Sequence, residues 1–285
     1  MTSRSLFELE QASYRYGNGV VALCEVDLSI REGERVAILG ATRSGKTTLL
    51  KILQGQLAAT AGRVQIFGQS FPPGKGRRRK DHRSRIGFSG PHPDTQLFRP
   101  TVLDDLIYGG AIVDVPLATS KDDFQSLCAT LEIEDLLDRS SAELSGGEKK
   151  IVSIAAALLG HPEVFIMDGL SPGLSAYFKQ RIVWLLTGSA FAPRTILLAT
   201  HDLALAESLC ERAILLSPDH RKAADGPIRT IVQDTDLLVA NYVIPGNRDH
   251  RGEAVHSPSA RKEGNVNMTV QVAGEEIAAS SQTIL

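Results

Sequence analysis

The first third of the chain alternates between apolar and polar positions in the manner of β-strands. The alternation runs through Leu6–Glu10 and Cys24–Ile30, and Arg35–Leu39 is a compact apolar run. Glycines between these segments indicate turns. Leucines at helical spacing predict a helix over Lys46–Leu57, and Arg63–Gly68 is typical of a strand that ends in a turn.

The second half of the chain changes to a helical and then a mixed pattern. Residues 101–159 are predicted to be mainly helical, and from residue 160 onward strands and helices alternate. The predicted segments are the strands Val164–Met167, Thr195–Thr200 and Ala213–Leu216, the helix Ala176–Leu186 and a helix from Leu203. Such alternation favours a parallel sheet covered by helices.

Two segments lack this periodicity. Residues 71–85 are rich in Gly and Pro and contain the basic run Arg77–Lys80, which is typical of a solvated loop, with phosphate or anionic-lipid contact as the alternative. The chain after about Gly246 has no aromatic residue and reads as a poorly packed tail. Met268–Val272 alternates and leaves one additional strand open.

Composition narrows the function classes. The 285 residues are 42% hydrophobic and 22% charged, which is ordinary for a globular protein and excludes a wholly disordered chain. A net charge of −2 argues against a polycation that binds nucleic acid, so no nucleic-acid partner is expected. The apolar helical run Ile151–Gly160 is about half of the roughly 20 residues that a bilayer span needs.

The chain ends and cysteines indicate the compartment. The N-terminus lacks the long apolar core of a secretory signal. The three cysteines, Cys24, Cys128 and Cys210, are odd in number and far apart, which disfavours a disulfide framework or a zinc cluster. We therefore expect a reducing compartment.

The segment Gly40–Thr47 fits the pattern G-x-x-x-x-G-K-[ST] between a predicted strand and a predicted helix. A loop of this kind turns its backbone N–H groups inward, and the positive end of the following helix adds to its attraction for phosphates. Lys46 supplies a charge for the β- and γ-phosphates, and the Thr47 hydroxyl can bind Mg²⁺. The predicted phosphate-binding residues are Gly40, Ala41, Thr42, Arg43, Ser44, Gly45, Lys46, Thr47 and Thr48. Alone, the loop fits a kinase or a GTPase equally well.

A second motif precedes the predicted helix Ile151–Leu159. Ser145 and Glu148 form the pattern of a capping box, in which each residue hydrogen-bonds the backbone of the other. Two glycines between them let a ligand approach the backbone at a helix N-terminus. The residues of this motif are Leu144, Ser145, Gly146, Gly147 and Glu148.

Together, these motifs resemble those of the nucleotide-binding subunits of ABC transporters, over about residues 6–245. Leu144–Glu148 is similar to the family's signature, Val164–Asp168 to its Walker B strand and Thr200–Asp202 to its switch-histidine loop, and Tyr16 falls where the family stacks a ring on adenine. The resemblance implies ATP and Mg²⁺ as cofactors. It also implies Asp168 and Thr47 as metal ligands, and Lys46 and His201 as catalytic residues.

The same resemblance implies a fold. The expected class is an α/β P-loop NTPase with a RecA-like, mostly parallel sheet, an N-terminal antiparallel β subdomain and an inserted α-helical signature subdomain at about residues 100–160. The expected domains are a nucleotide-binding domain over 1–245 and a poorly ordered tail over 246–285.

A subgroup is also indicated. His92–Phe98 followed by Pro100–Val102 resembles the N-P-D-D-Q-L-F…P-T-V stretch of energy-coupling-factor and cobalt-type importer ATPases, and Ala224–Pro227 matches a later segment of the same subgroup. The implied partners are membrane-embedded transporter subunits, which place the chain peripherally at the cytoplasmic face of the membrane.

The chain departs from the family pattern at four positions. Gly169 follows Asp168, where the family has a glutamate that polarises the attacking water, and losing a positioned general base slows a reaction by about 10²- to 10⁴-fold. Ser175 replaces the D-loop aspartate, and Pro91, which has no amide group, replaces the Q-loop glutamine. Arg43 replaces a glycine, so either it is strained in a left-handed backbone or its guanidinium contacts phosphate.

In the family two such domains pair head to tail, and each ATP lies between one chain's phosphate loop and the other's signature. The departures therefore indicate an ATP-binding subunit whose own site hydrolyses weakly or not at all. Its intact signature would complete the site of a non-identical ATPase subunit that keeps the glutamate. The alternatives are a nucleotide-binding regulatory or scaffold protein without a transport role and a slow homodimeric ATPase.

Overall fold

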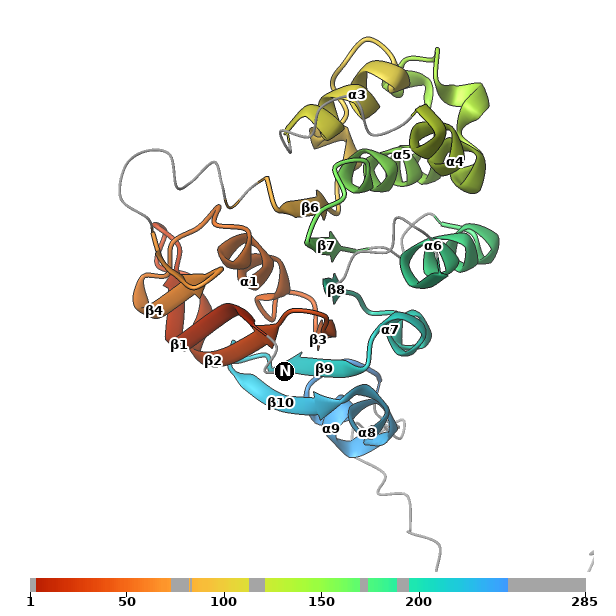
Figure 1. Ribbon diagram of the computed structural model, residues 1–285. Helices are drawn as coiled ribbons and strands as arrows, with labels where there is room; N and C mark the ends of the chain where they lie inside the picture. The colour runs from red at the N-terminus through yellow and green to blue at the C-terminus, as the bar shows by residue number, and fades with distance from the viewer. Residues whose placement is uncertain are drawn as a thin grey trace, which may run out of the picture. The chain divides into compact units, whose positions relative to one another are not determined.

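The structure is a computed structural model that describes residues 4–72, 82, 84–112, 121–169, 174–188 and 195–245 (Figure 1). The chain separates into two compact units, Met1–Pro245 and Gly246–Leu285. The second unit lies outside the described residues, as do the basic run Arg77–Lys80 and the alternating segment Met268–Val272. All that follows concerns the first unit.

A six-stranded sheet forms the centre of this unit. Its strands are β3 (Arg35–Gly40), β6 (Ile86–Ser89), β7 (Val164–Asp168), β8 (Thr195–Ala199), β9 (Arg212–Leu216) and β10 (Lys222–Pro227). They lie in the order β10-β9-β3-β8-β7-β6, and every neighbouring pair is parallel except β10 with β9. The predicted mostly parallel sheet is confirmed, with β3 near its middle and β6 at one edge.

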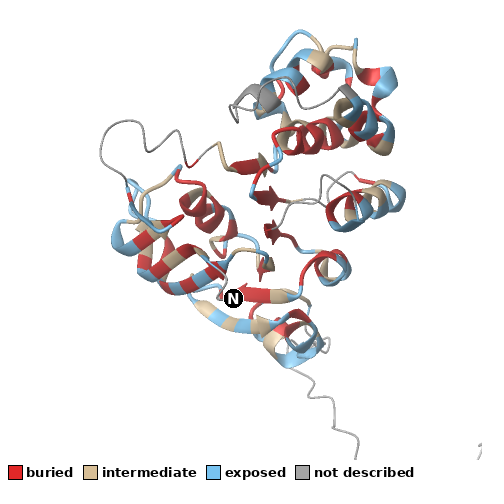
Figure 2. Cartoon of the chain, in the orientation of Figure 1, coloured by how far each residue is buried: buried red, intermediate tan, exposed pale blue. Residues whose placement is uncertain are grey.

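Successive residues of the central strands enter two different hydrophobic cores. One core receives Ala37, Leu39, Phe165, Met167, Leu198 and Leu215. The other receives Val36, Ile38, Val164, Ile166, Leu197 and Leu216. This two-sided burial explains the continuous apolar runs of the sequence, because a strand covered on both faces has no polar side (Figure 2).

An antiparallel sheet and helix α1 (Lys46–Leu53) contribute to the second core. The strands are β1 (Ser5–Arg15), β2 (Val21–Arg31), β4 (Ala61–Ile66) and β5 (Gln69–Phe71), in the order β2-β1-β4-β5. The prediction that the helix reaches Leu57 is wrong. It ends at Leu53 because Gly55 takes a positive φ of 66°.

The remaining helices pack on the first core, and α3, α4 and α5 gather at the β6 end of the sheet (Figure 1). The helices are α3 (Val102–Ile112), α4 (Lys121–Leu131), α5 (Gly146–Leu158), α6 (Ala176–Gly188), α7 (Leu203–Leu209), α8 (Ile228–Gln233) and α9 (Thr235–Ala240). Helix α5 begins at Gly146 and not at the predicted Ile151, because Ser145 caps it. No helix in the described part of the chain combines the length and apolarity needed to cross a membrane.

Candidate nucleotide-binding site

The motif residues meet at one edge of the parallel sheet. Gly40 ends β3, Asp168 ends β7, Gly90 follows β6 and Thr200 follows β8. Parallel strands bring their carboxyl ends to the same edge, which is where ligands bind in open α/β sheets. The register of the strand pairs determines how far along this edge each residue lies. Asp168 lies opposite Ala199, and Ser89 lies opposite Met167.

The phosphate loop depends on two glycines. Gly40 has a φ of 144° and Gly45 a φ of 107°, conformations that L side chains rarely adopt. A Cβ at Gly45 would lie 2.2 Å from the Ala22 carbonyl oxygen, and one at Gly40 would lie 2.6 Å from that of Leu216. The loop therefore packs against β2 and β9 too closely for any other residue at these two positions.

Lys46 is held inside the loop. Its side chain is only 9% exposed, and Nζ donates to the carbonyl oxygens of Gly40 and Ala41, each at 2.7 Å. Burial lowers the pKa of Lys46 to about 8, and the nearby charge of Asp168 opposes that shift. Lys46 is thus mostly protonated at neutral pH. Its ammonium donates to backbone oxygens and has to turn away from them to reach a phosphate.

Thr48 lies beside the residue predicted to stack on adenine. The Thr48 hydroxyl oxygen is 3.0 Å from the hydroxyl of Tyr16, and the Tyr16 ring also packs edge-on against Tyr14 with centroids 4.9 Å apart. Thr47, the neighbouring residue, is exposed at the start of α1. The structure therefore brings Tyr16 to the phosphate loop and leaves the Thr47 hydroxyl accessible.

Asp168 offers an unused ligand atom. The side chain is 6% exposed, and Oδ2 is buried without a hydrogen-bond partner among the described residues. A buried carboxylate oxygen without a hydrogen-bond partner destabilises the protein unless a cation or a hydrogen-bond donor binds it. This observation fits Mg²⁺, whose preferred ligands are oxygens, with Thr47 as the second candidate ligand. No group of three or more His, Cys, Asp or Glu ligands forms in the described part of the chain.

His201 lies near the same charges. Burial is the main cause that lowers its pKa, the ammonium of Lys46 lowers it further, and Asp168 opposes both. The histidine is therefore mainly neutral at pH 7. Asp202, the next residue, caps α7 by accepting a hydrogen bond from Leu205 N at 3.0 Å. The three predicted residues Lys46, Asp168 and His201 are thus close enough to affect one another electrostatically.

The signature segment forms the capping box that the sequence predicts. The Ser145 hydroxyl accepts from Glu148 N at 3.3 Å, and the Glu148 carboxylate accepts from Ser145 N at 2.7 Å. Hydrogen bonding of the Glu148 carboxylate to the hydroxyl and then to the backbone N–H of Ser145 lowers the pKa of Glu148. Ser145 and Gly146 are exposed, and a Cβ at Gly146 would meet nothing within 4 Å. The helix N-terminus is therefore open to a ligand.

Two of the four departures from the family pattern are neighbours in space. Gly169 has a φ of 70°, and a Cβ at this position would lie 3.6 Å from Cβ of Pro91. Residues 170–173, which follow Gly169, lie outside the described part of the chain. The residues at the glutamate and glutamine positions therefore face each other across the ends of β6 and β7.

The other two departures have separate local explanations. Ser175 caps α6, because its hydroxyl accepts from Phe178 N at 3.3 Å. Arg43 has a φ of 69°, so the predicted left-handed backbone is present at this residue. Its side chain is exposed. An Arg in this conformation is less stable than a glycine by about 1–2 kcal/mol.

One residue of the site was not predicted. Lys150 lies in α5 and is 3% exposed, and its Nζ donates to the carbonyl oxygens of Gly90 at 2.6 Å and Asp168 at 3.4 Å. Burial lowers the pKa of Lys150 to about 8, against the opposing charge of Asp168. In the sequence, adjacent lysines after a cap are typical of a solvated first turn, so no local signal distinguishes Lys150 from Lys149.

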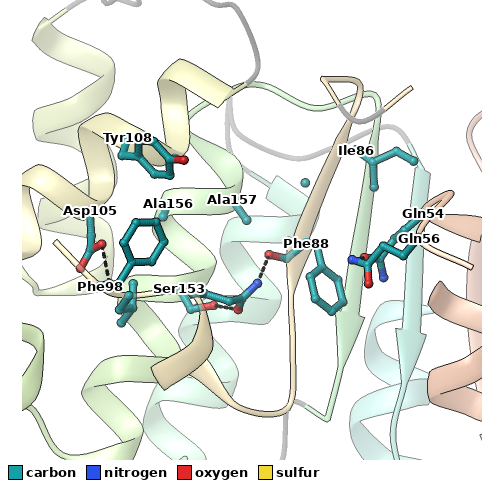
Figure 3. A pocket seen from close by; sticks show the side chains of 14 residues that line it. Gln54, Gln56, Ile86, Phe88, Phe98, Asp105, Tyr108, Ser153, Ala156 and Ala157 are labelled. Carbon is teal, nitrogen blue, oxygen red and sulfur yellow. Dashed lines mark hydrogen bonds between the residues drawn. The ribbon is translucent and has the colours of Figure 1, made fainter. Parts of the chain in front are cut away.

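A cavity of about 510 Å³ is lined by the segment after α1, by β6 and the loop that follows it, and by helices α3 and α5. In Figure 3, Gln54 and Gln56 lie on the α1 side, Phe98 and Tyr108 on the α3 side, and Phe88 of β6 between them. Gln96 fixes the β6 end, since it donates to Phe88 O at 3.1 Å and accepts from Ser153 Oγ at 2.7 Å.

The rim of this cavity exposes aromatic rings. Phe98 is 59% exposed and packs edge-on against Tyr108, with centroids 5.3 Å apart. The guanidinium of Arg99 lies 4.1 Å from the centroid of the Tyr108 ring. This combination of exposed aromatic rings and an arginine is typical of the residues that dominate protein interfaces.

Known proteins are similar to this chain in sequence and in fold. The family described as "ABC transporter" matches residues 23–170. The cobalt import ATP-binding protein CbiO of Rhodobacter capsulatus is 34% identical over 239 residues, covering 83% of this chain and 84% of that protein. Two solved structures extend the comparison to the fold.

The first is cbiO1 from Clostridium perfringens, described as part of the ABC transporter complex cbiONQ. It is 27% identical, with a TM-score of 0.69 over 82% of this chain and 93% of its own. The second, the ATP-binding cassette MJ0796, was solved as a dimer bound to ADP and Pi. It is 26% identical, with a TM-score of 0.64 over 79% of this chain and 99% of its own. The predicted fold class is thereby confirmed. The chain belongs to the ABC transporter family of ATP-binding proteins and is related to its cobalt-type importer ATPases.

Proposed function

We propose that the chain is the ATP-binding subunit of an energy-coupling-factor-like importer. It holds Mg-ATP in a pocket that hydrolyses weakly or not at all, and it supplies its signature to a second, non-identical ATPase subunit. One observation carries the proposal: the phosphate loop and the signature keep their geometry, while Gly169 occupies the place of the glutamate directly after Asp168.

The retained groups support binding more than turnover. Lys46 and the loop glycines suit a triphosphate, and Asp168 and Thr47 suit Mg²⁺, which supplies charge neutralisation at the phosphates when bound. A glycine at position 169 offers no group that accepts a proton from water. His201 is mainly neutral, and no carboxylate in the described part of the chain forms an ion pair with it. We therefore assign to this pocket the role of a nucleotide-dependent clamp.

The open signature supports the second half of the proposal. In a head-to-tail pair, the exposed N-terminus of α5 faces the partner's nucleotide, and its free N–H groups and dipole favour a phosphate there. Because the partner chain contributes its own glutamate, its pocket is the one that turns over. The complex thus has one holding site and one hydrolytic site.

The test is Ser145→Arg in the complex reconstituted with its membrane and ATPase partners. An arginine fills the space that the partner's phosphate needs, so we expect ATPase activity to fall by about 10²-fold or more, while nucleotide affinity of the purified chain stays unchanged. Full ATPase activity of the variant complex would contradict the proposal. Rapid turnover by the purified chain alone would instead favour a homodimeric ATPase.

The aromatic residues at the cavity rim support the proposal that the chain binds a membrane-embedded partner. Phe98, Tyr108 and Arg99 form a compact aromatic surface beside α3, which fits a short helix from a membrane-embedded subunit. cbiO1, whose description places it in a transporter complex, shares the fold. We therefore place the chain peripherally at the cytoplasmic face of the membrane, with transporter subunits as partners.

Pro91 favours one alternative, a regulatory or scaffold protein that binds nucleotide without driving transport. The proline removes the side chain through which the family couples nucleotide to the membrane subunit. Affinity purification from native membranes with mass spectrometry distinguishes the two functions. Recovery of a polytopic membrane protein together with a second ATPase supports the importer, and recovery of neither supports the alternative.

A further inference from the structure

Lys150 brings a second buried cation to the nucleotide pocket. Its ammonium joins the carbonyl oxygens of Gly90 and Asp168, the residues directly before Pro91 and Gly169. One side chain of the signature helix therefore contacts the residues that follow β6 and end β7. Of the three N–H donors of an ammonium, two have these carbonyl partners, and the described residues offer no partner for the third.

The charges around Asp168 do not balance. Two buried lysines lie near the single buried carboxylate of Asp168: Lys150 donates to the Asp168 carbonyl oxygen, and Lys46 lies in the phosphate loop, where the charge of Asp168 also acts on it. A surplus positive charge in a pocket with low exposure favours an anionic ligand. The Lys150 ammonium donates to two uncharged carbonyls and shares the one nearby carboxylate with Lys46, so a bound anion lowers the cost of burying it.

We propose that Lys150 is a resident cation of the nucleotide pocket, which stabilises the bound triphosphate electrostatically alongside Mg²⁺ and contributes most when the metal is absent. This inference rests on the proposed function, because it assumes that nucleotide binds at the phosphate loop. It adds a residue from the chain's own signature helix to that pocket. Charge, and not the hydrogen bonds to the strand ends, is the property that matters.

The experiment is calorimetric titration of the full chain with ATP, once in excess Mg²⁺ and once in EDTA. Lys150→Gln keeps a donor for the Gly90 carbonyl but removes the charge, and Lys150→Met removes both. We expect each variant to lose about tenfold in affinity in EDTA. In Mg²⁺ the expected loss is about threefold, because the metal cancels about half of the triphosphate charge.

Lys149→Gln is the matched control. Lys149 is the next residue of the same helix, but its ammonium pairs with Asp94 at 2.6 Å, on the outside of the protein. We expect its affinity to equal that of the wild type in both buffers. Urea unfolding of each variant checks the fold, and Lys150→Gln, which preserves length and a donor, carries the test if Lys150→Met does not fold.

The outcomes separate the possible explanations. Wild-type affinity in Lys150→Gln with a loss only in Lys150→Met assigns the effect to hydrogen bonding or packing and overturns the inference. An equal loss with and without Mg²⁺ overturns it as well. Absence of ATP binding by the wild type in both buffers contradicts the proposed function itself, which is a distinguishable result.

Discussion

At the scale of single residues, Arg43 and Gly169 have nearly the same backbone φ, although Arg43 carries a long charged side chain and Gly169 carries none. The φ of Arg43 is 69° and that of Gly169 is 70°, a region in which glycine is the least strained residue. The phosphate loop therefore keeps an arginine under strain, and such strain is commonly retained at functional sites. The position after Asp168 is, by contrast, relaxed.

Replacing Arg43 tests the strain. Because glycine adopts a positive φ without a Cβ penalty, we expect Arg43→Gly to be more stable than Arg43→Ala by about 1 kcal/mol. Both variants remove the guanidinium, so the comparison isolates the backbone. Urea denaturation monitored by circular dichroism measures the difference, and equal midpoints would show that the loop relaxes around residue 43.

Replacing Gly169 tests the assigned defect. Gly169→Glu restores an acid directly after Asp168, and its Cβ has room beside Pro91. We expect phosphate release from this pocket to rise by about 10²-fold. Gly169→Gln has the same size but no base, so it should show no gain. Both should lose about 1–2 kcal/mol of stability from the left-handed backbone. Equal rates for the two variants would contradict the assigned role of position 169.

At the scale of elements, the cap of α5 determines where the signature helix starts. The reciprocal hydrogen bonds of Ser145 and Glu148 satisfy backbone N–H groups at its N-terminus. We expect Ser145→Ala to lower the free energy of unfolding by about 1 kcal/mol, whereas Ser145→Asp, which can still cap, should lose much less. Chemical denaturation of the purified chain measures both. A similar loss in the two variants would mean that capping is not the contribution of this hydroxyl.

Elements with a strong apolar pattern could be predicted from the sequence, and those without one could not. The strands β3, β7, β8 and β9 are buried on both faces, so their apolar runs mark them. Strand β10 lies at the sheet edge and has no buried residue, and β6 has only four residues. Neither provides a periodic signal. The end of α1 depends on a single residue beyond the helix, Gly55, which the leucine spacing does not reveal, whereas the start of α5 is where the predicted cap Ser145 puts it.

The residues of the site also divide into those that the sequence could predict and those that it could not. Residues that belong to contiguous motifs, such as Lys46 and Ser145, could be found because backbone geometry ties those residue types to one spacing. Lys150 could not be found, because its partners Gly90 and Asp168 are distant in sequence and meet it only through the order of β6 and β7 in the sheet.

At the scale of the whole molecule, the aromatic rim is the surface whose use can be tested. We expect Phe98→Glu combined with Tyr108→Glu to reduce recovery of membrane subunits by about tenfold, since buried aromatic residues dominate interface energies. Nucleotide affinity should not change. Trp184→Glu on α6 is the control, because Trp184 is 55% exposed, similar to Phe98, but lies outside the cavity. Equal loss in the control would point to a general solubility effect.

The strand order of the central sheet separates the two halves of the pocket. The phosphate loop follows β3, which is flanked by β8 and β9, whereas Pro91 and Gly169 follow β6 and β7 at the margin. Under the proposed function, a design that restores hydrolysis therefore needs changes on only one side of the sheet. Because a Cβ at 169 would be in ordinary van der Waals contact with Pro91, an acid at 169 and a glutamine at 91 can be introduced together, and the phosphate loop can be left unchanged.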